Sequence, residues 1–191
     1  MNRKELRILE SLDGIIRQSS IKAIIDSIVP RVEWKLAQDL TALLAWEPVP
    51  LGTYRGGLPA MIRSSWVFVL RAQSDTGPER HPVSCQRMMS YENSGDLQVW
   101  DNGVWRHNLL ISDFSAPIES RWVSIRPNMW HRAVTSRENW VVISFHTVTE
   151  DALIEERPDE INEGSIIQRR YLEEPTVGGK SYLKGCLGNP R

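Results

Sequence analysis

Residues 2–46 place apolar side chains at the three- and four-residue spacing of amphipathic helices. The clearest stripe consists of Ile21, Ile24, Ile25 and Ile28. Pro30 is expected to end that helix, and a third helix is expected to run to about Trp46. The pattern therefore predicts three helices whose apolar faces cover a following domain or a second copy of the chain.

From Glu47 onward the helical spacing gives way to short runs of strand-forming residues separated by turn residues. Seven such runs are expected to be strands: 66–72, 85–91, 96–100, 105–110, 121–125, 131–135 and 140–148. Asn102-Gly103, between two of these runs, favours a type I′ hairpin turn because both residues accept positive φ angles. Strands of this length and spacing predict an all-β core, either a sandwich or a barrel.

The chain turns acidic after Thr149, where Arg157 is the only basic residue between Glu150 and Glu163. We expect a solvated helix and loop there, followed by a tail with little periodicity. The chain is thus divided into an N-terminal helical region (1–50), a β-barrel (51–149) and an acidic segment with a C-terminal tail (150–191).

The formal net charge is −1, from 23 basic and 24 acidic residues, so nucleic acid and anionic membranes are not expected partners. The N-terminus is charged where a signal peptide is apolar, and no apolar run is long enough to span a membrane. Two distant cysteines, Cys85 and Cys186, make no disulfide framework, which favours a cytoplasmic location. Six of the eight tryptophans fall between residues 66 and 140 and predict an aromatic core or pocket.

Candidate chemistry centres on two histidines about fifty residues apart, each beside a strand-like run and a tight turn. His81 precedes a turn that contains Gly95, and His131 ends the proline-led turn 126–131. This pair of motifs resembles those of the cupin superfamily, over about residues 64–148. The resemblance implies a jelly-roll β-barrel whose histidines hold a divalent metal ion, Fe(II) or Zn(II) first, with Mn, Ni or Cu as alternatives.

The third metal ligand implied by the resemblance has four candidates, because the second histidine of the first cupin motif is missing. Gln86 stands where the family has Glu or Gln, provided that the strand carries a bulge. Glu79 lies two residues before His81 and could take the missing histidine's place. Cys85 shares strand parity with His81 and implies a softer, zinc-like site. His146 becomes a ligand if the last strand faces the same cavity.

The residues beside these candidates are expected to form a substrate pocket. Arg87 stands in a strand otherwise rich in apolar residues and is costly to bury without an anion. It therefore either faces outward or clamps a carboxylate substrate, and Arg87 and Tyr91 are the candidate catalytic residues. Met88, Trp100 and Trp130 are expected in the core or as walls of the pocket.

These features favour a metal-dependent enzyme that acts on a small metabolite carrying a carboxylate or an amine. With Fe(II) it resembles a cupin dioxygenase. With Zn(II) it resembles cupins that catalyse an isomerisation or a bond-forming rearrangement, such as N–N bond formation. The missing motif histidine favours a third class, a metal-free cupin that binds a small ligand or is structural. We also expect a homodimer, since cupins commonly pair and the isoleucine stripe offers apolar surface.

Overall fold

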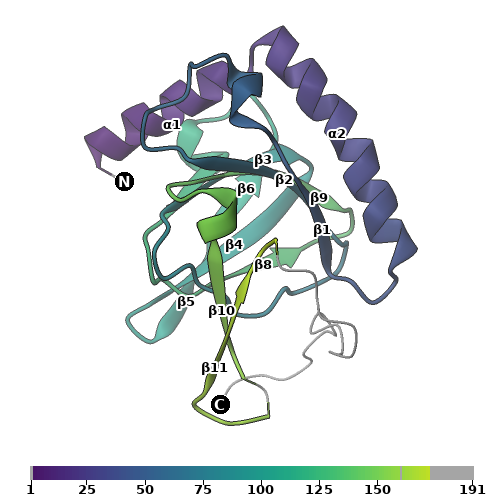
Figure 1. Cartoon of the computed structure of the whole chain (residues 1–191), viewed down its shortest axis with the longest axis vertical. Helices are drawn as coiled ribbons and strands as arrows, with labels where there is room; N and C mark the ends of the chain where they lie inside the picture. The colour runs from purple at the N-terminus through teal and green to yellow at the C-terminus, as the bar shows by residue number, and fades with distance from the viewer. Residues whose placement is uncertain (1, 160, 173–191) are drawn as a thin grey trace.

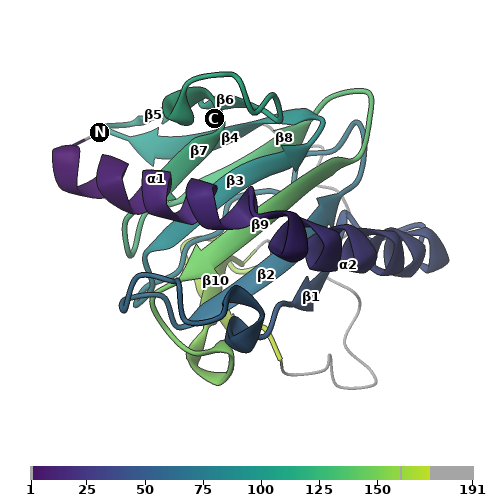
Figure 2. The ribbon, with the colours of Figure 1, turned by 90° about the horizontal axis from the view of Figure 1, so that it is seen from above.

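The computed structural model describes residues 2–159 and 161–172. Two helices, α1 (Arg3–Ile16) and α2 (Ser19–Gln38), lie across one face of a β-sandwich (Figure 1, Figure 2). Three short 3₁₀ helices lie in connections between strands: η1 (Leu51–Tyr54), η2 (Ile118–Ser120) and η3 (Glu150–Ala152). The described chain thus has a helical layer followed by two layers of sheet.

The prediction of three helices is wrong because Pro30 does not end α2. Ile28, Val29 and Val32 are buried on either side of the proline, so the apolar face continues through it. The burial of these side chains offsets the helical hydrogen bond that proline removes. Trp46, expected at the end of a third helix, lies in a strand instead.

Five antiparallel strands form the sheet under the helices, in the order β1-β2-β9-β3-β7. They are β1 (Leu44–Pro48), β2 (Ser64–Leu70), β9 (Trp140–His146), β3 (Gln86–Glu92) and β7 (Trp122–Ile125). The side chains of β2 and β9 are buried along their whole length. Both faces are covered, because one packs against α1 and α2 and the other against the second sheet (Figure 2).

The second sheet is built around one central strand, β4 (Ser94–Asp101). It pairs with β5 (Val104–Arg106), β6 (Leu109–Ile111) and β8 (His131–Thr135). The predicted strand 105–110 is therefore two strands, β5 and β6. On the far side of β8, Asp75 and Glu79 form isolated antiparallel bridges with it. Two antiparallel sheets face to face confirm the predicted jelly-roll core with an N-terminal helical region.

Two turn predictions have different outcomes. Asn102 and Gly103 take positive φ angles of 50° and 82° between β4 and β5, as predicted. Gly95 is not a turn residue, because it lies inside β4 while the positive φ of 62° belongs to Asn93. Glycine is required at position 95 for space, since a Cβ there would lie 2.1 Å from the buried ring of Trp140.

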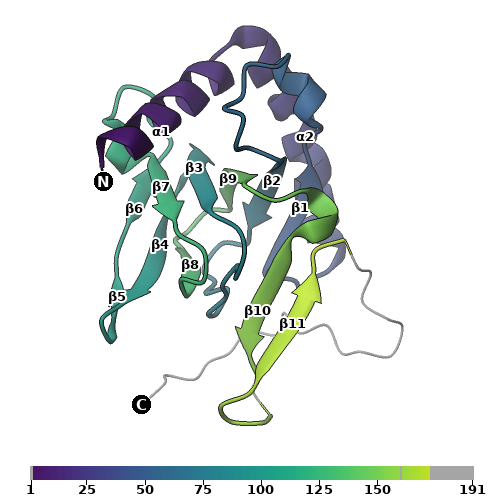
Figure 3. The same ribbon diagram turned by 60° about the vertical axis from the view of Figure 1, so that its left-hand side comes forward.

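The acidic segment after Thr149 forms a β-hairpin rather than the predicted solvated helix and loop. β10 (Ile154–Pro158) pairs antiparallel with β11 (Ile166–Arg170). Figure 3 shows this hairpin at the end of the sandwich away from α1 and α2. Glu155 on β10 is fully buried, so part of the charge of this segment faces inward. Cys186, the second of the two distant cysteines, lies outside the described residues.

The isoleucine stripe packs against the chain's own sheet. Ile21, Ile25 and Ile28 are buried, and Ile24 is the exposed member of the four. The homodimer stays a prediction, without support from this stripe. Among the described residues, no helix has the length and apolar character needed to cross a bilayer.

Candidate metal centre

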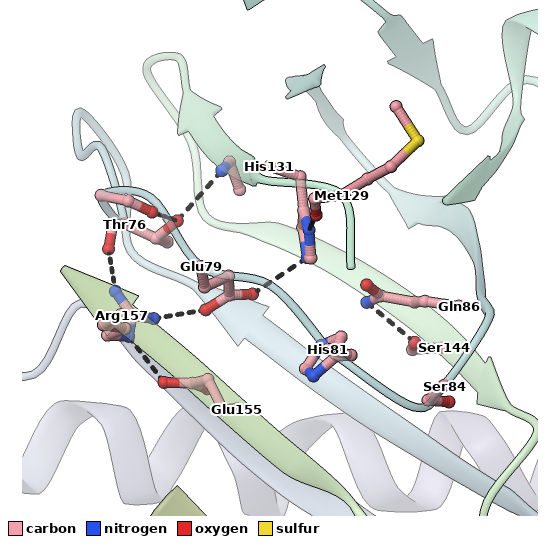
Figure 4. Close-up of polar contacts among 12 residues, drawn as sticks. Thr76, Glu79, His81, Ser84, Gln86, Met129, His131, Ser144, Glu155 and Arg157 are labelled. Atoms are coloured by element: carbon pink, nitrogen blue, oxygen red, sulfur yellow. Dashed lines mark hydrogen bonds and ion pairs between the residues drawn. The ribbon is translucent and has the colours of Figure 1, made fainter. Parts of the chain in front are cut away.

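Three side chains converge between the sheets: Glu79, His81 and His131 (Figure 4). Their possible ligand atoms all lie within 4.8 Å of one another. Glu79 and His131 are paired across the two strands, each backbone N–H donating to the other's carbonyl at 2.8 Å. Glu79 and His81 lie two residues apart in a segment that forms isolated bridges to β8 and β10, and their ligand atoms point to the same group. The backbone thus brings together residues that stand about fifty positions apart.

Each histidine of this group has one ring nitrogen held and one left open. Nδ1 of His81 lies 2.9 Å from the Ile154 carbonyl, and Nδ1 of His131 lies 3.0 Å from the Met129 carbonyl. A carbonyl only accepts, so Nδ1 carries the proton and Nε2 carries the lone pair. Both Nε2 atoms are buried without a hydrogen-bond partner. Metal-binding histidines have this arrangement, with the far nitrogen donating to a carbonyl or carboxylate.

The carboxylate of Glu79 is held from the opposite side by Arg157. One oxygen forms an ion pair with Nη2 of Arg157, and the other lies 3.4 Å from Nε2 of His131. Arg157 also donates to Oε1 of Glu155 and to the Thr76 carbonyl, each at 2.6 Å. Burial favours a raised pKa for Glu79, but the Arg157 charge, with a smaller effect of the nearby His131, lowers that pKa overall. Glu79 is therefore a carboxylate at neutral pH.

Burial keeps two histidines of this region neutral. It lowers the pKa of His81, and repulsion between a protonated His81 and a protonated His131 lowers it further. The pKa of His146 lies well below its usual value for the same reason, and repulsion from a protonated His81 lowers it further. Neutral imidazole is the form that binds metals, so no proton has to be displaced from His81 at neutral pH.

Gln86 and His146 lie beside this group, but serines engage both side chains. The His146 ring centre is 5.1 Å from that of His81. Its Nε2 lies 2.9 Å from Oγ of Ser144 and its Nδ1 lies 3.3 Å from Oγ of Ser84. Gln86 donates to the same Ser144 oxygen at 3.1 Å. Among the predicted third ligands with a carboxylate, thiol or imidazole, Glu79 is the one whose ligand atom lies within 4.8 Å of both histidines. The amide oxygen of Gln86 is also buried without a hydrogen-bond partner.

Cys85 lies outside the group, on the helix-facing side. The prediction that Cys85 and His81 share a face assumed a strand through residues 82–85. These residues are not a strand, so the alternation does not hold there. Cys85 lines an open cleft of about 810 Å³ with Glu5 and Ser124, a cleft that none of the three candidate ligands lines. The buried histidines are the better candidate site, because their open nitrogens need a partner and the cleft residues Glu5 and Ser124 already bond each other.

Arg87 and Tyr91 also face the helices rather than the histidines. Arg87 donates two hydrogen bonds to the Glu5 carboxylate of α1, at 2.7 and 3.1 Å. Tyr91 donates a short hydrogen bond to Asp26 of α2. The strand alternation of β3 puts these odd-numbered residues opposite Gln86. Of the two alternatives for Arg87, the structure has the one in which the side chain faces away from the histidines, paired with a carboxylate of the chain itself.

Of the three predicted wall residues, one lies in the core and two lie toward the surface. Met88 is buried in the hydrophobic core between the sheets. Trp100 is 40% exposed and packs edge-on against Trp105 at the β4–β5 hairpin. Trp130 lies under the guanidinium of Arg80, 4.5 Å from the ring centre. Met88 has its predicted core position, whereas the two tryptophans lie at the surface side of the second sheet.

Three residues of the C-terminal hairpin region adjoin the site and were missed: Glu155, Arg157 and Tyr171. The ring of Tyr171 is buried, with its centre 6.0 Å from that of His81 and 5.8 Å from that of Trp66. The signal that could have found this region is Arg157 itself. A lone arginine in an acidic stretch indicates a specific ion pair.

Neither a protein-family model nor a curated protein matches this chain. Among solved structures, the coconut allergen cocosin is 14% identical over 56% of this chain and 26% of its own, with a TM-score of 0.41. The capsular polysaccharide assembling protein CapF from Staphylococcus aureus is 10% identical over 57% of this chain and 29% of its own, with a TM-score of 0.44. Oxalate decarboxylase from Lactobacillus farciminis is 9% identical over 56% and 29%, with a TM-score of 0.43.

The likeness is one of fold alone. This chain spans only 26% to 29% of the length of these three proteins, and nothing about its activity follows from theirs. The cupin-like jelly roll rests on the strand order of the two sheets. Any function must be inferred from the site itself.

Proposed function

We propose that this chain is a metal-dependent enzyme that holds one divalent ion with Glu79, His81 and His131. The observation that carries the proposal is the pair of buried Nε2 atoms without partners, next to a carboxylate. Two histidines and one carboxylate are the ligand set of non-haem Fe(II) oxygenases. An oxygenase of this kind is the function we favour.

The chain's own groups prepare the site for such an ion. The carbonyls of Ile154 and Met129 fix the tautomer of the two histidines, and Arg157 orients the Glu79 carboxylate. Both histidine side chains are buried, which excludes bulk water from the ligand atoms. A bound ferrous ion would supply the oxygen chemistry, while these groups fix its position.

The polar groups around the site favour a substrate that donates hydrogen bonds. The guanidinium that contacts the ligands, Arg157, already has three partners and is not available to a carboxylate substrate. In contrast, Oε2 of Glu155 is buried without a partner and can only accept. An amine or hydroxyl group supplies the missing donor, so we propose an amine- or hydroxyl-bearing metabolite rather than a carboxylate.

A zinc enzyme is the second candidate, because two histidines and one glutamate are also a catalytic zinc ligand set. It would catalyse an isomerisation or a bond-forming rearrangement without redox change. The two candidates separate on metal content and oxygen dependence.

The test is metal analysis of protein purified without chelator, followed by reconstitution of the metal-free form with Fe(II) under nitrogen or with Zn(II). We expect close to one equivalent of ion per chain and, for the iron form, oxygen uptake that depends on an added amine or alcohol. Well under one equivalent after reconstitution with either metal would contradict the proposal and favour a metal-free binding module.

A further inference from the structure

The C-terminal hairpin β10–β11 is hydrogen-bonded directly to the segment 79–81, which carries two of the candidate ligands. The backbone groups of Arg80 and Glu156 bond each other at 3.0 and 2.9 Å. Their side chains form an ion pair at 2.7 Å. Arg80 stands between Glu79 and His81, so β10 is the immediate neighbour of both ligands (Figure 4).

This hairpin also supplies the outer partners of those two ligands. The Ile154 carbonyl of β10 accepts from Nδ1 of His81, and Arg157 of β10 holds the Glu79 carboxylate. The third ligand, His131, depends on Met129 of its own segment instead. Outer partners of this kind set the orientation of a ligand, and their loss typically lowers metal affinity by about 10- to 100-fold.

The residue that follows β11 packs on the same group. Tyr171 is 7% exposed, and its ring lies against those of Trp46, Trp66 and Phe68 as well as against His81. The hairpin is thus fastened at both of its strands, by polar contacts from β10 and by an aromatic contact after β11.

Resting on the proposed function, we infer that the β10–β11 hairpin positions the metal ligands and that Arg157 is its principal positioning residue. Arg157 joins Glu79 to Glu155 and to the Thr76 carbonyl, which fixes the carboxylate relative to the hairpin. Metal binding and docking of the hairpin must then stabilise each other, because coupling between two binding events is reciprocal.

The decisive variant is Arg157→Lys, with Glu156→Gln as its matched control. Lysine keeps the positive charge but lacks the planar fork that reaches three partners. Glu156→Gln weakens an ion pair between the same two strands without touching a ligand residue, because Glu156 bonds Arg80 and Gln168. A general loosening of the hairpin affects both variants, whereas ligand positioning affects Arg157→Lys alone.

We expect the Zn(II) affinity of the full chain, measured by calorimetry, to fall by about 10- to 100-fold in Arg157→Lys and by less than about twofold in Glu156→Gln. The visible absorption of the Co(II) form should change in Arg157→Lys and stay as in the wild type in Glu156→Gln. Hydrogen exchange of the β10 amides should slow when Zn(II) is added to the wild type, and less so in Arg157→Lys.

If Arg157→Lys has wild-type Zn(II) affinity and an unchanged Co(II) spectrum, the inference is overturned and the proposed function is not affected. Failure of the wild type to bind either ion would overturn the proposed function and the inference with it. If circular dichroism shows that Arg157→Lys is unfolded, Glu155→Gln takes its place, since it weakens the anchor of Arg157 and keeps its bond to Glu79. Its Zn(II) affinity should fall severalfold, and an unchanged affinity would overturn the inference.

Discussion

Two regions of this molecule bury polar groups in different ways. Between the helices and the first sheet, the Asp13 carboxylate of α1 is bound to the Arg121 guanidinium and, at 2.9 Å, to Nε1 of Trp122. Between the sheets, His81 and His131 each keep one buried nitrogen without a partner. The first region joins secondary-structure elements, whereas the second presents open lone pairs.

The difference indicates which buried polar groups hold the fold together and which await a ligand. A buried polar group without a hydrogen-bond partner costs about 1–3 kcal/mol of folding stability. The converging open nitrogens of His81 and His131 therefore lower the stability of the metal-free fold. Arg87, on the helix side, also has one nitrogen without a partner, but its others are bound to Glu5. Open groups that converge on one point, rather than single open atoms, therefore mark the candidate site.

The largest effect is expected on the helix side. Asp13→Ala should lower the free energy of unfolding by about 3–5 kcal/mol, because it leaves the fully buried Arg121 charge without its partner. Urea denaturation measures this change. Zn(II) affinity should stay unchanged. A loss of affinity equal to that of a ligand variant would contradict the assignment of stability to the helix side and metal binding to the histidine side.

The next effect concerns the ligands. His81→Ala and His131→Ala should each lower Zn(II) affinity by more than about 100-fold, because direct ligands matter more than their outer partners. The matched control is His107→Ala, since that histidine is exposed and bonds Asp96 on the second sheet. Calorimetric titration that finds wild-type affinity in either ligand variant would contradict the assignment.

The pH dependence of stability distinguishes the two regions without mutation. His81 and His146 have folded pKa values below the usual 6.5, so the unfolded chain binds more protons there. Stability of the metal-free protein should therefore fall as the pH drops below about 6.5, by up to about 1.4 kcal/mol per pH unit for each histidine. A free energy of unfolding that is flat between pH 7 and 5 would contradict this.

The carboxylates on the helix side, Glu5 and Asp13, affect stability in a lower pH range. Burial favours raised pKa values for Glu5 and Asp13, but bonds to Arg87 and Arg121 lower both overall. Their contribution is present above the usual values of 4.5 and 3.8 and is lost only as the pH falls through the lowered values. Denaturation at pH 6.5 to 5 therefore reports on the histidine side.

The smallest effect is expected at Tyr91, the residue first considered catalytic. Tyr91→Phe removes one hydrogen bond to Asp26 and should cost about 1 kcal/mol of stability. Metal content and turnover should equal those of the wild type, measured on the iron-reconstituted protein. A large loss of turnover with intact metal binding would restore a catalytic role for Tyr91.

The sequence located much of the fold because turn chemistry and strand patterning agree there. Asn102-Gly103 gives the predicted hairpin, and His131 begins a strand as expected. The prediction was wrong where it depended on the usual role of a single proline or glycine. Pro30 lies inside a helix whose apolar face continues past it, and Gly95 makes room for Trp140 rather than a turn.

The candidate site was predicted only in part, because strand patterning identifies a residue's face only where the chain forms a regular, amphipathic strand. His81 and His131 follow from motif spacing, and Glu79 follows from its place two residues before His81. Cys85 does not, because alternation holds only while the chain is a strand. Glu155 and Arg157 were missed because their strand faces a polar cluster, so its charged residues point inward and its alternation does not look amphipathic.

The most direct test of the metal centre is a crystal structure of the Zn(II)-loaded protein with anomalous data collected at the zinc edge. We predict one strong peak per chain, within about 2.0–2.3 Å of Nε2 of His81, Nε2 of His131 and a carboxylate oxygen of Glu79. A map without a peak at these three atoms, or with its zinc at another cluster such as Asp96 and His107, would contradict the central claim.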